Sequence, residues 1–290
     1  MSKKMAVLLM MVLSLSLIFA GCGTKEDTAD KKNDNVDTNT GDDLKEDNTF
    51  KVGMEAGYAP FNWTQMDDSN GGVKIEGGSD YAGGYDVEIA KKIADGLGKE
   101  LVIVKTEWDG LVPALLSGKI DGIIAGMSPT ADRKETIDFT EIYYKSDLVM
   151  VVKKGSQYEN VTSIQDFSAA KITAQLNTFH YSVIDQIEGV KKDVALDNFP
   201  TMRVALESGI IDGYVSERPE GVSAAAANEN FAMVEFEEGF ETSEEDTAIA
   251  VGVKKDSELT DKINDVLAGI TDEERQNLMD AAIVNQPSAQ

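Results

Sequence analysis

The strongest constraint on the fold is a pattern that occurs twice in the chain. Residues 108–118 and 199–209 each have helical apolar spacing that ends at Ser-Gly, and each is followed by a short apolar run that contains Ile-Asp. A helix that leads directly into a buried strand is the repeating unit of a parallel sheet. Ligands of such sheets lie beyond the carboxyl ends of the strands, so two copies that faced each other would form a cleft.

The chain after residue 49 continues this alternation. Buried strands are predicted for "FKVGMEA", "ELVIVKTE" and "AKITAQL", and helices for "GYDVEIAKKIADGLGK" and "TFHYSVIDQI". Residues 64–78 predict a hairpin with its turn at Asn70-Gly71. We therefore expect an α/β fold with two lobes, each a mostly parallel sheet flanked by helices.

Two extended segments indicate how the lobes are joined. "SDLVMVVKKGS" follows the first copy of the repeat, and "ETSEEDTAIAVGVKKDS" follows the second. Each would carry the chain from one lobe to the other, which gives a two-segment hinge. The first lobe is then expected to comprise residues 50–147 and 243–290, and the second lobe residues 148–242. The helical pattern after residue 257 would pack on the first lobe.

The N-terminal residues have a different character. Lys3 and Lys4 precede an uncharged, mostly apolar run that is shorter than the roughly 20 residues of a membrane-spanning helix. Such a run is typical of a cleaved export signal, so residues 1–21 are predicted to be a signal peptide. Cys22, the only cysteine, follows Ala-Gly as in the lipobox of bacterial lipoproteins, although Phe19 departs from the usual Leu. Lipidation at Cys22 is predicted; an ordinary cleavage site with an incidental thiol is the alternative.

Composition sets the remaining limits. Residues 22–49 are polar with few aliphatic side chains, so they predict a disordered tether between the lipid and the lobes. The net charge is −25, which repels nucleic acid and anionic lipid headgroups, and we expect no nucleic-acid partner. The 42% apolar content is sufficient for buried cores. The protein is thus expected outside the cytoplasm, lipid-anchored to the outer face of the cell membrane.

Several segments resemble one family. "YAPFNW", "GGYDVEIAKKIA", "QLNT", "GIIDGYVSERP" and the long block "WDGLVPALLSGKIDGIIAGMSPTADRKETIDFTEIYY" are similar to the polar amino-acid-binding proteins of bacterial ABC importers. The resemblance implies a periplasmic-binding-protein-like clamp that closes on one free L-amino acid and delivers it to a permease with its ATPase. It implies a monomer with no cofactor and no bound metal.

The resemblance also assigns residues of the first lobe. Arg133 matches the arginine that pairs with the α-carboxylate of the ligand, a role that suits the two parallel donors of a guanidinium. Ser128 matches a hydroxyl contact, and Gly126 and Met127 would contribute backbone groups just before a helix start. The alternative for Arg133 is a surface arginine on a helix.

In the second lobe, Thr178 would donate its hydroxyl and N–H to the same carboxylate at the start of a helix. Asn177 stands where the family commonly has Gly, and Asn is the best substitute where the backbone is left-handed. Glu217 stands where the family generally has an Asp that binds the α-amino group, so the contact could be direct or through water. An exposed carboxylate at a strand end is the alternative for Glu217.

Side-chain recognition is assigned to three further residues. Tyr58 and Trp108 match residues that sandwich the ligand side chain, although Tyr and Trp at strand ends are often core residues. Glu55 stands where relatives that prefer cationic ligands carry an acid, and a buried carboxylate is costly unless it is paired. Arginine is the first expected ligand and lysine the second, followed by histidine or ornithine; glutamine is the neutral alternative.

The same fold also includes enzymes such as cyclic-acid dehydratases, which need a positioned acid and base in the cleft. His180 is the only histidine, and nothing else in the sequence pairs with it as a catalytic base. It is expected at the cleft edge or on the surface. No nucleophile motif, metal-ligand cluster or phosphate loop is present. The sequence therefore favours a binding protein over an enzyme.

Overall fold

The structure is a computed structural model, and it describes residues 48–287. The predicted signal peptide, the predicted lipidation at Cys22 and nearly all of the predicted tether lie outside these residues. Among residues 48–287, no helix combines the length and the apolar character needed to cross a membrane.

The first sheet joins strands that are far apart in the sequence. Its order is β6-β1-β7-β14-β8, with bounds Glu100–Lys105, Thr49–Met54, Gly122–Ile123, Ala248–Val253 and Asp138–Lys145. β1 pairs in parallel with β6 and β7, and β14 alone runs against the others. Every residue of β14 is buried, as expected for a strand covered on both faces of a sheet. The mostly parallel sheet predicted for the first lobe is confirmed.

The second sheet repeats this plan. Its order is β11-β10-β12-β9-β13, with bounds Lys191–Lys192, Lys171–Thr173, Gly213–Glu217, Leu148–Lys153 and Phe231–Val234. β10 pairs in parallel with β11 and β12, whereas β9 runs against both of its neighbours. The chain crosses from the first sheet to the second between β8 and β9, and it returns between β13 and β14. The first strand after each crossing is therefore the strand that runs opposite to the others in its sheet, β9 in the second sheet and β14 in the first.

A small third sheet adjoins the first lobe. Its order is β2-β3-β5-β4, with bounds Gly57–Tyr58, Asn62–Gln65, Tyr81–Gly83 and Val73–Lys74. The predicted hairpin is wrong in its pairing, because β3 and β4 both pair with β5 and not with each other. Asn70 and Gly71 do have the left-handed φ values of a turn. The Gln65 side chain donates to two carbonyls of the turn loop, which holds this loop against the end of β3.

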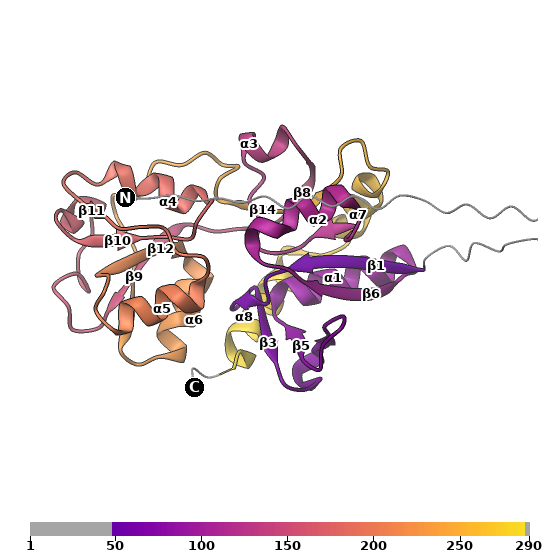
Figure 1. Cartoon of the computed structure of the whole chain (residues 1–290), viewed down its shortest axis with the longest axis horizontal. Coiled ribbons are helices and arrows are strands. Elements are labelled where there is room, and N and C mark those ends of the chain that lie inside the picture. The colour runs from indigo at the N-terminus through magenta and orange to yellow at the C-terminus, as the bar shows by residue number, and fades with distance from the viewer. Residues whose placement is uncertain (1–47, 288–290) are drawn as a thin grey trace, which may run out of the picture. The chain divides into compact units, whose positions relative to one another are not determined.

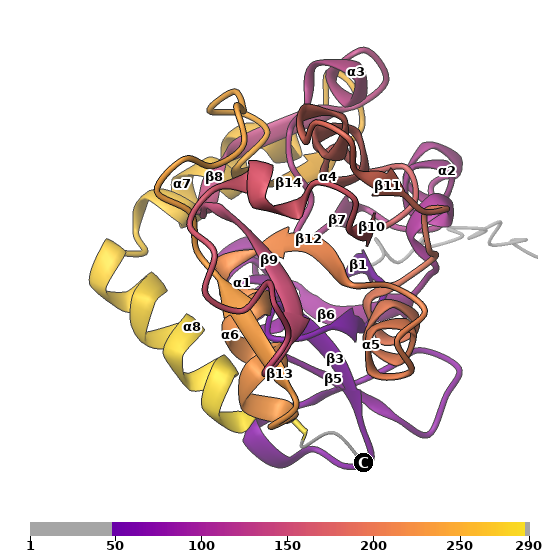
Figure 2. The same ribbon diagram turned by 90° about the vertical axis from the view of Figure 1, so that its left-hand side faces the viewer.

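The helices divide between the two sheets (Figure 1). With the first sheet lie α1, α2, α3, α7 and α8, with bounds Tyr85–Leu97, Leu111–Ser117, Ala131–Lys134, Leu259–Ala268 and Asp272–Asn285. With the second sheet lie α4, α5 and α6, with bounds Phe179–Val183, Phe199–Glu207 and Arg218–Ala227. Gly118 ends α2 in a left-handed conformation, as predicted. Helices α7 and α8 pack against α1, and α8 also runs beside α6 (Figure 2).

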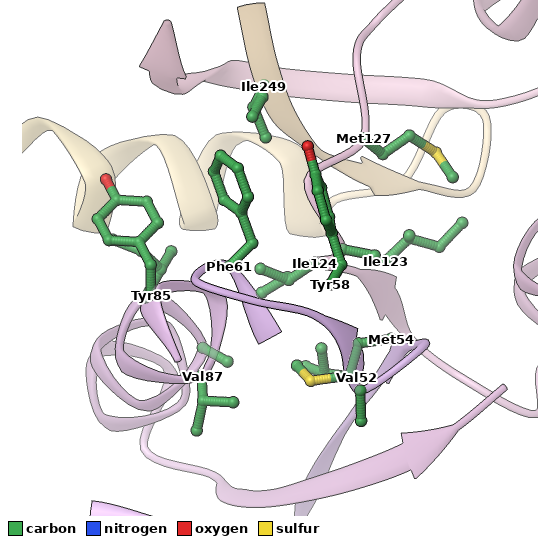
Figure 3. Close-up of a cluster of buried hydrophobic side chains, with 14 of the residues drawn as sticks. Val52, Met54, Tyr58, Phe61, Tyr85, Val87, Ile123, Ile124, Met127 and Ile249 are labelled. Atoms are coloured by element: carbon green, nitrogen blue, oxygen red, sulfur yellow. The ribbon is translucent and has the colours of Figure 1, made fainter. Parts of the chain in front are cut away.

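The larger hydrophobic core extends from the first sheet toward the second. Figure 3 shows Tyr58 beside Phe61, with its hydroxyl directed away from the side chains of Val52 and Met54. On its other face, Tyr58 stacks on Phe199 of α5 with ring centres 4.2 Å apart. Apolar packing therefore joins the two lobes next to the ends of their strands.

Candidate functional site

Strand ends from both sheets converge on one site. Glu55 follows β1 and Gly126 follows β7, whereas Gln175 comes after β10 and Glu217 ends β12. These are carboxyl ends of parallel strands, where α/β sheets bind ligands. Side chains of the two lobes contact each other directly at this point, as Glu55 does with Gln175. The cleft expected between the two copies of the repeat is therefore where the predicted site residues gather.

A small cavity lies among these residues. Six residues predicted for the site line it, namely Tyr58, Trp108, Gly126, Ser128, Arg133 and Thr178. Four more residues complete the lining, namely Gln175, Phe179, His180 and Phe199. The enclosed volume of about 10 Å³ holds at most one water molecule. An amino acid could therefore enter only if the two lobes moved apart.

Arg133 reaches the cavity from α3. Its Nη1 donates to the carbonyl of Ser128 at 3.0 Å and its Nη2 to the carbonyl of Asn177 at 3.3 Å. The guanidinium carbon lies 5.0 Å from the centre of the Trp108 ring, a cation–π contact. Burial lowers the pKa of Arg133 to about 10, while the charge of Glu217 favours the protonated form. Arg133 therefore remains a cation at neutral pH and can bind a carboxylate.

Glu217 lies at the end of β12 and is only 2% exposed, so the alternative of an exposed carboxylate is wrong. The Tyr58 hydroxyl donates a hydrogen bond to its Oε2, and Nε2 of His180 lies 3.0 Å from its Oε1. Burial raises the pKa of the Glu217 carboxyl, but the His180 imidazole and the hydrogen bond from Tyr58 outweigh burial and hold the pKa below its ordinary value. Glu217 is therefore ionised and can bind an ammonium group.

Glu55 is also buried, with 7% of its surface exposed. Both of its carboxylate oxygens lie 3.1 Å from Nε2 of Gln175. Burial raises the pKa of Glu55 from its ordinary 4.5 to about 7, the hydrogen bond from Gln175 lowers it, and the charges of Glu107 and Asp109 raise it further. Glu55 and Glu107 also border a larger cavity of about 580 Å³. Two further acids therefore surround Glu55, and the adjoining cavity is also lined by Lys105 and Arg203.

The remaining predicted residues act through backbone or structural contacts. Asn177 has φ 56°, so the predicted left-handed backbone is confirmed, and its side chain donates to Asp109 at 2.8 Å. Thr178 stands at the N-cap of α4, but its hydroxyl donates to the carbonyl of Gln175 at 2.7 Å. The Ser128 hydroxyl donates to the carbonyl of Asp246, and the Met127 carbonyl accepts from the N–H of Ala250. These contacts fix the loops that carry Arg133 and Thr178.

Sequence reasoning missed part of the lining. Phe199 aligns with Trp108 when the sequences of the two copies of the repeat are aligned. The repeat could therefore have indicated that Phe199 lines the site. Gln175 is the first residue of "QLNT", and the sequence gives no signal of its contact with Glu55. For His180, the expected surface position is wrong, because the residue is only 6% exposed; it lines the cavity of the cleft and faces Glu217. Thr178 is the N-cap of α4, and it lines the cavity together with the first two helix residues, Phe179 and His180.

The site contains several carboxylates, but they are not arranged as a metal centre. Within residues 48–287, no group of three His, Cys, Asp or Glu side chains could hold a metal ion together. Arg133 and His180 line the cavity itself, whereas the carboxylates of Glu217 and Glu55 contact the lining residues His180 and Gln175. Such a set of charged groups is suited to a free amino acid with a positive charge on its side chain.

The sequence profile of one family covers nearly all of the described chain. The profile of "Bacterial extracellular solute-binding proteins, family 3" matches residues 50–282. A "Probable histidine-binding protein" of Campylobacter jejuni is 32% identical over 201 residues, which span 66% of this chain and 73% of that protein. An arginine-binding extracellular protein of Bacillus subtilis is 28% identical over 226 residues, which span 76% of this chain and 80% of that protein.

Solved structures agree with the sequence comparison. An amino acid ABC transporter substrate-binding protein of Streptococcus pneumoniae, bound to L-arginine, superposes with a TM-score of 0.72 and 27% identity. The superposition covers 82% of this chain and 94% of the other. The two-lobed architecture expected from the sequence is therefore the one that this similar protein adopts.

Proposed function

The chain belongs to family 3 of the bacterial extracellular solute-binding proteins, and we propose that the solute is a cationic amino acid, with L-arginine first and L-lysine second. It is a substrate-binding protein of an amino-acid ABC transporter and not an enzyme. The single observation that carries the choice of ligand is Glu55, a buried carboxylate at a strand end whose neighbours Glu107 and Asp109 are also acidic.

The groups common to all amino acids are assigned to the centre of the site. We assign the α-carboxylate to Arg133 and Thr178, and the α-amino group to Glu217. Arg133 and Glu217 lie on different lobes, so a zwitterion between them would bridge the lobes. Tyr58 and Trp108 line the cavity and would lie along the side chain of the ligand, and the backbone groups of Gly126, Met127, Ser128 and Asn177 would complete the site.

The distal end of the ligand is assigned to Glu55. A carboxylate that is removed from water is strongly destabilised unless a cation or several donors satisfy it. Gln175 supplies one amide nitrogen to both oxygens, and the pKa of about 7 indicates that this is not enough to offset burial and the neighbouring acids. A guanidinium or ammonium group would neutralise Glu55 with full charge. Histidine and ornithine follow lysine in the expected order.

Glutamine is the neutral alternative, and one contact favours it. The amide of Gln175 already binds Glu55, so the amide of a ligand could take a similar position. With its pKa near 7, Glu55 could also be protonated and donate to an amide oxygen. The affinity for L-arginine should depend strongly on the charge of Glu55 and the affinity for L-glutamine only weakly, so the two ligands can be distinguished.

A screen of the purified protein tests the ligand class. The twenty amino acids, L-ornithine and L-cystine are compared by thermal shift, since a ligand that binds only the folded state raises the melting temperature. L-arginine is expected to give the largest shift. Titration calorimetry then gives affinities for L-arginine, L-lysine and L-glutamine. A parent protein that binds L-glutamine most tightly would disprove the cationic assignment while leaving the binding-protein function intact.

Two variants separate the common groups from the distal one. Arg133→Ala is expected to weaken all three ligands by a similar factor, about 2–5 kcal/mol, because the α-carboxylate loses its charged partner. Glu55→Gln is expected to weaken L-arginine and L-lysine by about 2 kcal/mol or more, and L-glutamine much less. Glu107→Gln is the matched control, because Glu107 borders the same cavity as Glu55 but is exposed. Equal losses for L-arginine and L-glutamine in Glu55→Gln would contradict the role of Glu55.

Delivery and location complete the proposal. We propose that a monomer, with lobes at 50–147 plus 243–290 and at 148–242, hands the amino acid to the permease and ATPase of an importer. We further propose that residues 1–21 are a signal peptide and that a lipid on Cys22 holds the protein at the outer face of the cell membrane. The polar residues that follow Cys22 support this location, because they can act as a tether.

Replacement of Cys22 tests the anchor. The Cys22→Ala protein loses the thiol that carries the lipid, so it is expected in the medium or in soluble fractions after cell fractionation. The parent is expected in the membrane fraction. Ser14→Ala, a change inside the predicted signal peptide, is the control for altered export. If Cys22→Ala protein sediments with membranes as completely as the parent, the protein is held there by something other than Cys22.

A further inference from the structure

His180 is a buried imidazole that the assigned roles leave unused. It is 6% exposed, lines the cavity, and places Nε2 at 3.0 Å from Oε1 of Glu217. That approach is close enough for an ion pair, but it lacks the alignment of a hydrogen bond, and Nδ1 has no hydrogen-bond partner either. A buried polar side chain without a hydrogen bond is rare in native proteins. The Glu217 carboxylate is therefore the charged group in direct contact with His180, whose ring centre also lies 4.3 Å from that of Phe179.

The other charged and titratable groups near this pair lie on different elements. The Tyr58 hydroxyl donates to the second oxygen of Glu217, and Arg133 and Asp86 act on Glu217 through their charges. Within residues 48–287, His180 is the only basic side chain within ion-pair distance of Glu217. The carboxylate assigned to the α-amino group of the ligand thus already has a partner within the protein.

We propose that the α-ammonium group of a bound amino acid replaces the His180 imidazolium at Glu217, and that His180 gives up its proton when the ligand binds. This inference rests on the proposed function. The change is balanced: a protonated imidazole and a ligand ammonium give a neutral imidazole, an ammonium–Glu217 pair and one proton that passes to the buffer. His180 thereby acts as a positioning residue that keeps Glu217 ionised and in place before the ligand arrives.

The physical reason is that one buried carboxylate cannot balance two adjacent cations. Two like charges in a poorly solvated site disfavour each other's protonated form. Histidine is the side chain whose charge most readily changes between pH 5 and 8, whereas the α-ammonium of an amino acid keeps its proton there. Protons and ligand therefore compete for Glu217 through His180, and binding is weaker at low pH.

The single histidine allows a direct test on the unsubstituted protein. The chain has only one histidine, so a protein labelled in histidine and purified without a histidine tag gives one imidazole signal by NMR. Titration of that signal is compared with and without saturating L-arginine. The midpoint of the titration is expected to move to lower pH when L-arginine is present. An unchanged or higher midpoint overturns the proposal.

Titration calorimetry in buffers of different ionisation enthalpy counts the protons that binding releases. Glu55 would also lose a proton beside a cationic ligand, so its contribution is removed in Glu55→Gln. The matched pair is Glu55→Gln with and without His180→Gln. The Glu55→Gln protein should release protons near pH 6 when it binds the ligand. Its affinity should rise with pH, by up to about tenfold per pH unit if one full proton is released. The protein that also carries His180→Gln should release fewer protons and show a flatter dependence.

The outcomes separate the two proposals. L-arginine is the probe, and L-glutamine is used if L-arginine does not bind. If either binds and His180→Gln leaves proton release unchanged, the role of His180 is overturned and the binding function stands; the released proton then comes from another group such as Asp86. If no amino acid in the panel binds the parent protein, both proposals are overturned. If His180→Gln does not fold, the NMR titration of the parent protein decides.

Discussion

Glu55 is a residue whose ionisation should be visible in the stability of the protein. Its pKa is raised from 4.5 to about 7, chiefly by burial, so the folded state holds this proton more tightly than the unfolded chain does. The resulting stabilisation is complete below about pH 4.5, and it is lost as the pH rises through 7. The rise corresponds to roughly 3 kcal/mol.

Glu55→Gln should therefore match the parent near pH 4.5 and exceed it in stability at pH 8, by up to about 3 kcal/mol. Urea denaturation without ligand at both pH values measures this difference. Asp86, whose pKa burial raises to about 6, titrates in both proteins and cancels from the comparison. A parent and a variant with the same dependence on pH would show that Glu55 is not the buried acid described above.

Residue-level prediction succeeded where chemistry alone restricts the choice. Asn177 could be assigned a left-handed backbone because few residues other than Gly tolerate it, and the structure has φ 56° there. The burial of His180 and its contact with Glu217 could not be predicted, because a single histidine has no recognisable partner in a linear sequence. Its partner Glu217 is 37 positions away and comes from another strand, so the pairing appears only after the second sheet has formed.

At the scale of elements, the loop from β7 to α3 depends on Gly126. Gly126 has φ 61°, and a Cβ there would lie 2.7 Å from Cε1 of Tyr58. Gly126→Ala should cost about 1–2 kcal/mol in backbone strain and should also displace the Tyr58 ring from the cavity. Both a lower melting temperature and a loss of affinity for the amino acid are expected, measured by thermal denaturation and calorimetry.

Gly155→Ala separates strain from steric contact. Gly155 has φ 76°, but a Cβ there would meet nothing within 4 Å. This variant should show a similar loss of stability with unchanged affinity. If Gly126→Ala binds the ligand as tightly as Gly155→Ala does, Tyr58 is not held against Gly126 in the way that the contact implies.

Elements were predictable where periodicity and end signals agree. The helix of α2 and its stop at Gly118 follow from apolar spacing and a C-terminal Gly. The strand pairing of the small third sheet was not predictable. The Asn70-Gly71 signal gives the position of the turn, but it does not show which strands pair with each other. β5 comes later in the sequence and lies between β3 and β4, a choice that depends on packing.

At the scale of the whole described chain, the contacts across the site connect two lobes that share two crossings. Arg133 with Asn177, Glu55 with Gln175 and Tyr58 with Glu217 all join one lobe to the other. A ligand held between the lobes should favour the arrangement that keeps such groups together. Small-angle scattering should therefore show a smaller radius of gyration with saturating L-arginine.

Arg133→Ala at the same L-arginine concentration is the control for this compaction, because it is expected to bind weakly. A scattering profile of the parent that does not change at saturation would argue against hinge closure. The two lobes and the crossings could be predicted from the sequence because the repeated helix–strand unit marks each sheet. Which side chains meet across the cleft could not, since that depends on the angle between the sheets.

The placement of β14 has a consequence for the order in which the chain acquires its structure. Within the described residues, β8 pairs only with β14 in the first sheet, and β14 is the last strand along the chain. All strands of the second sheet lie between Leu148 and Val234. A chain that emerges from the ribosome or the export channel with its N-terminus first therefore has a complete second sheet while the first still lacks a strand. The second lobe, although its first strand comes later in the chain, can therefore complete its sheet before the first lobe does.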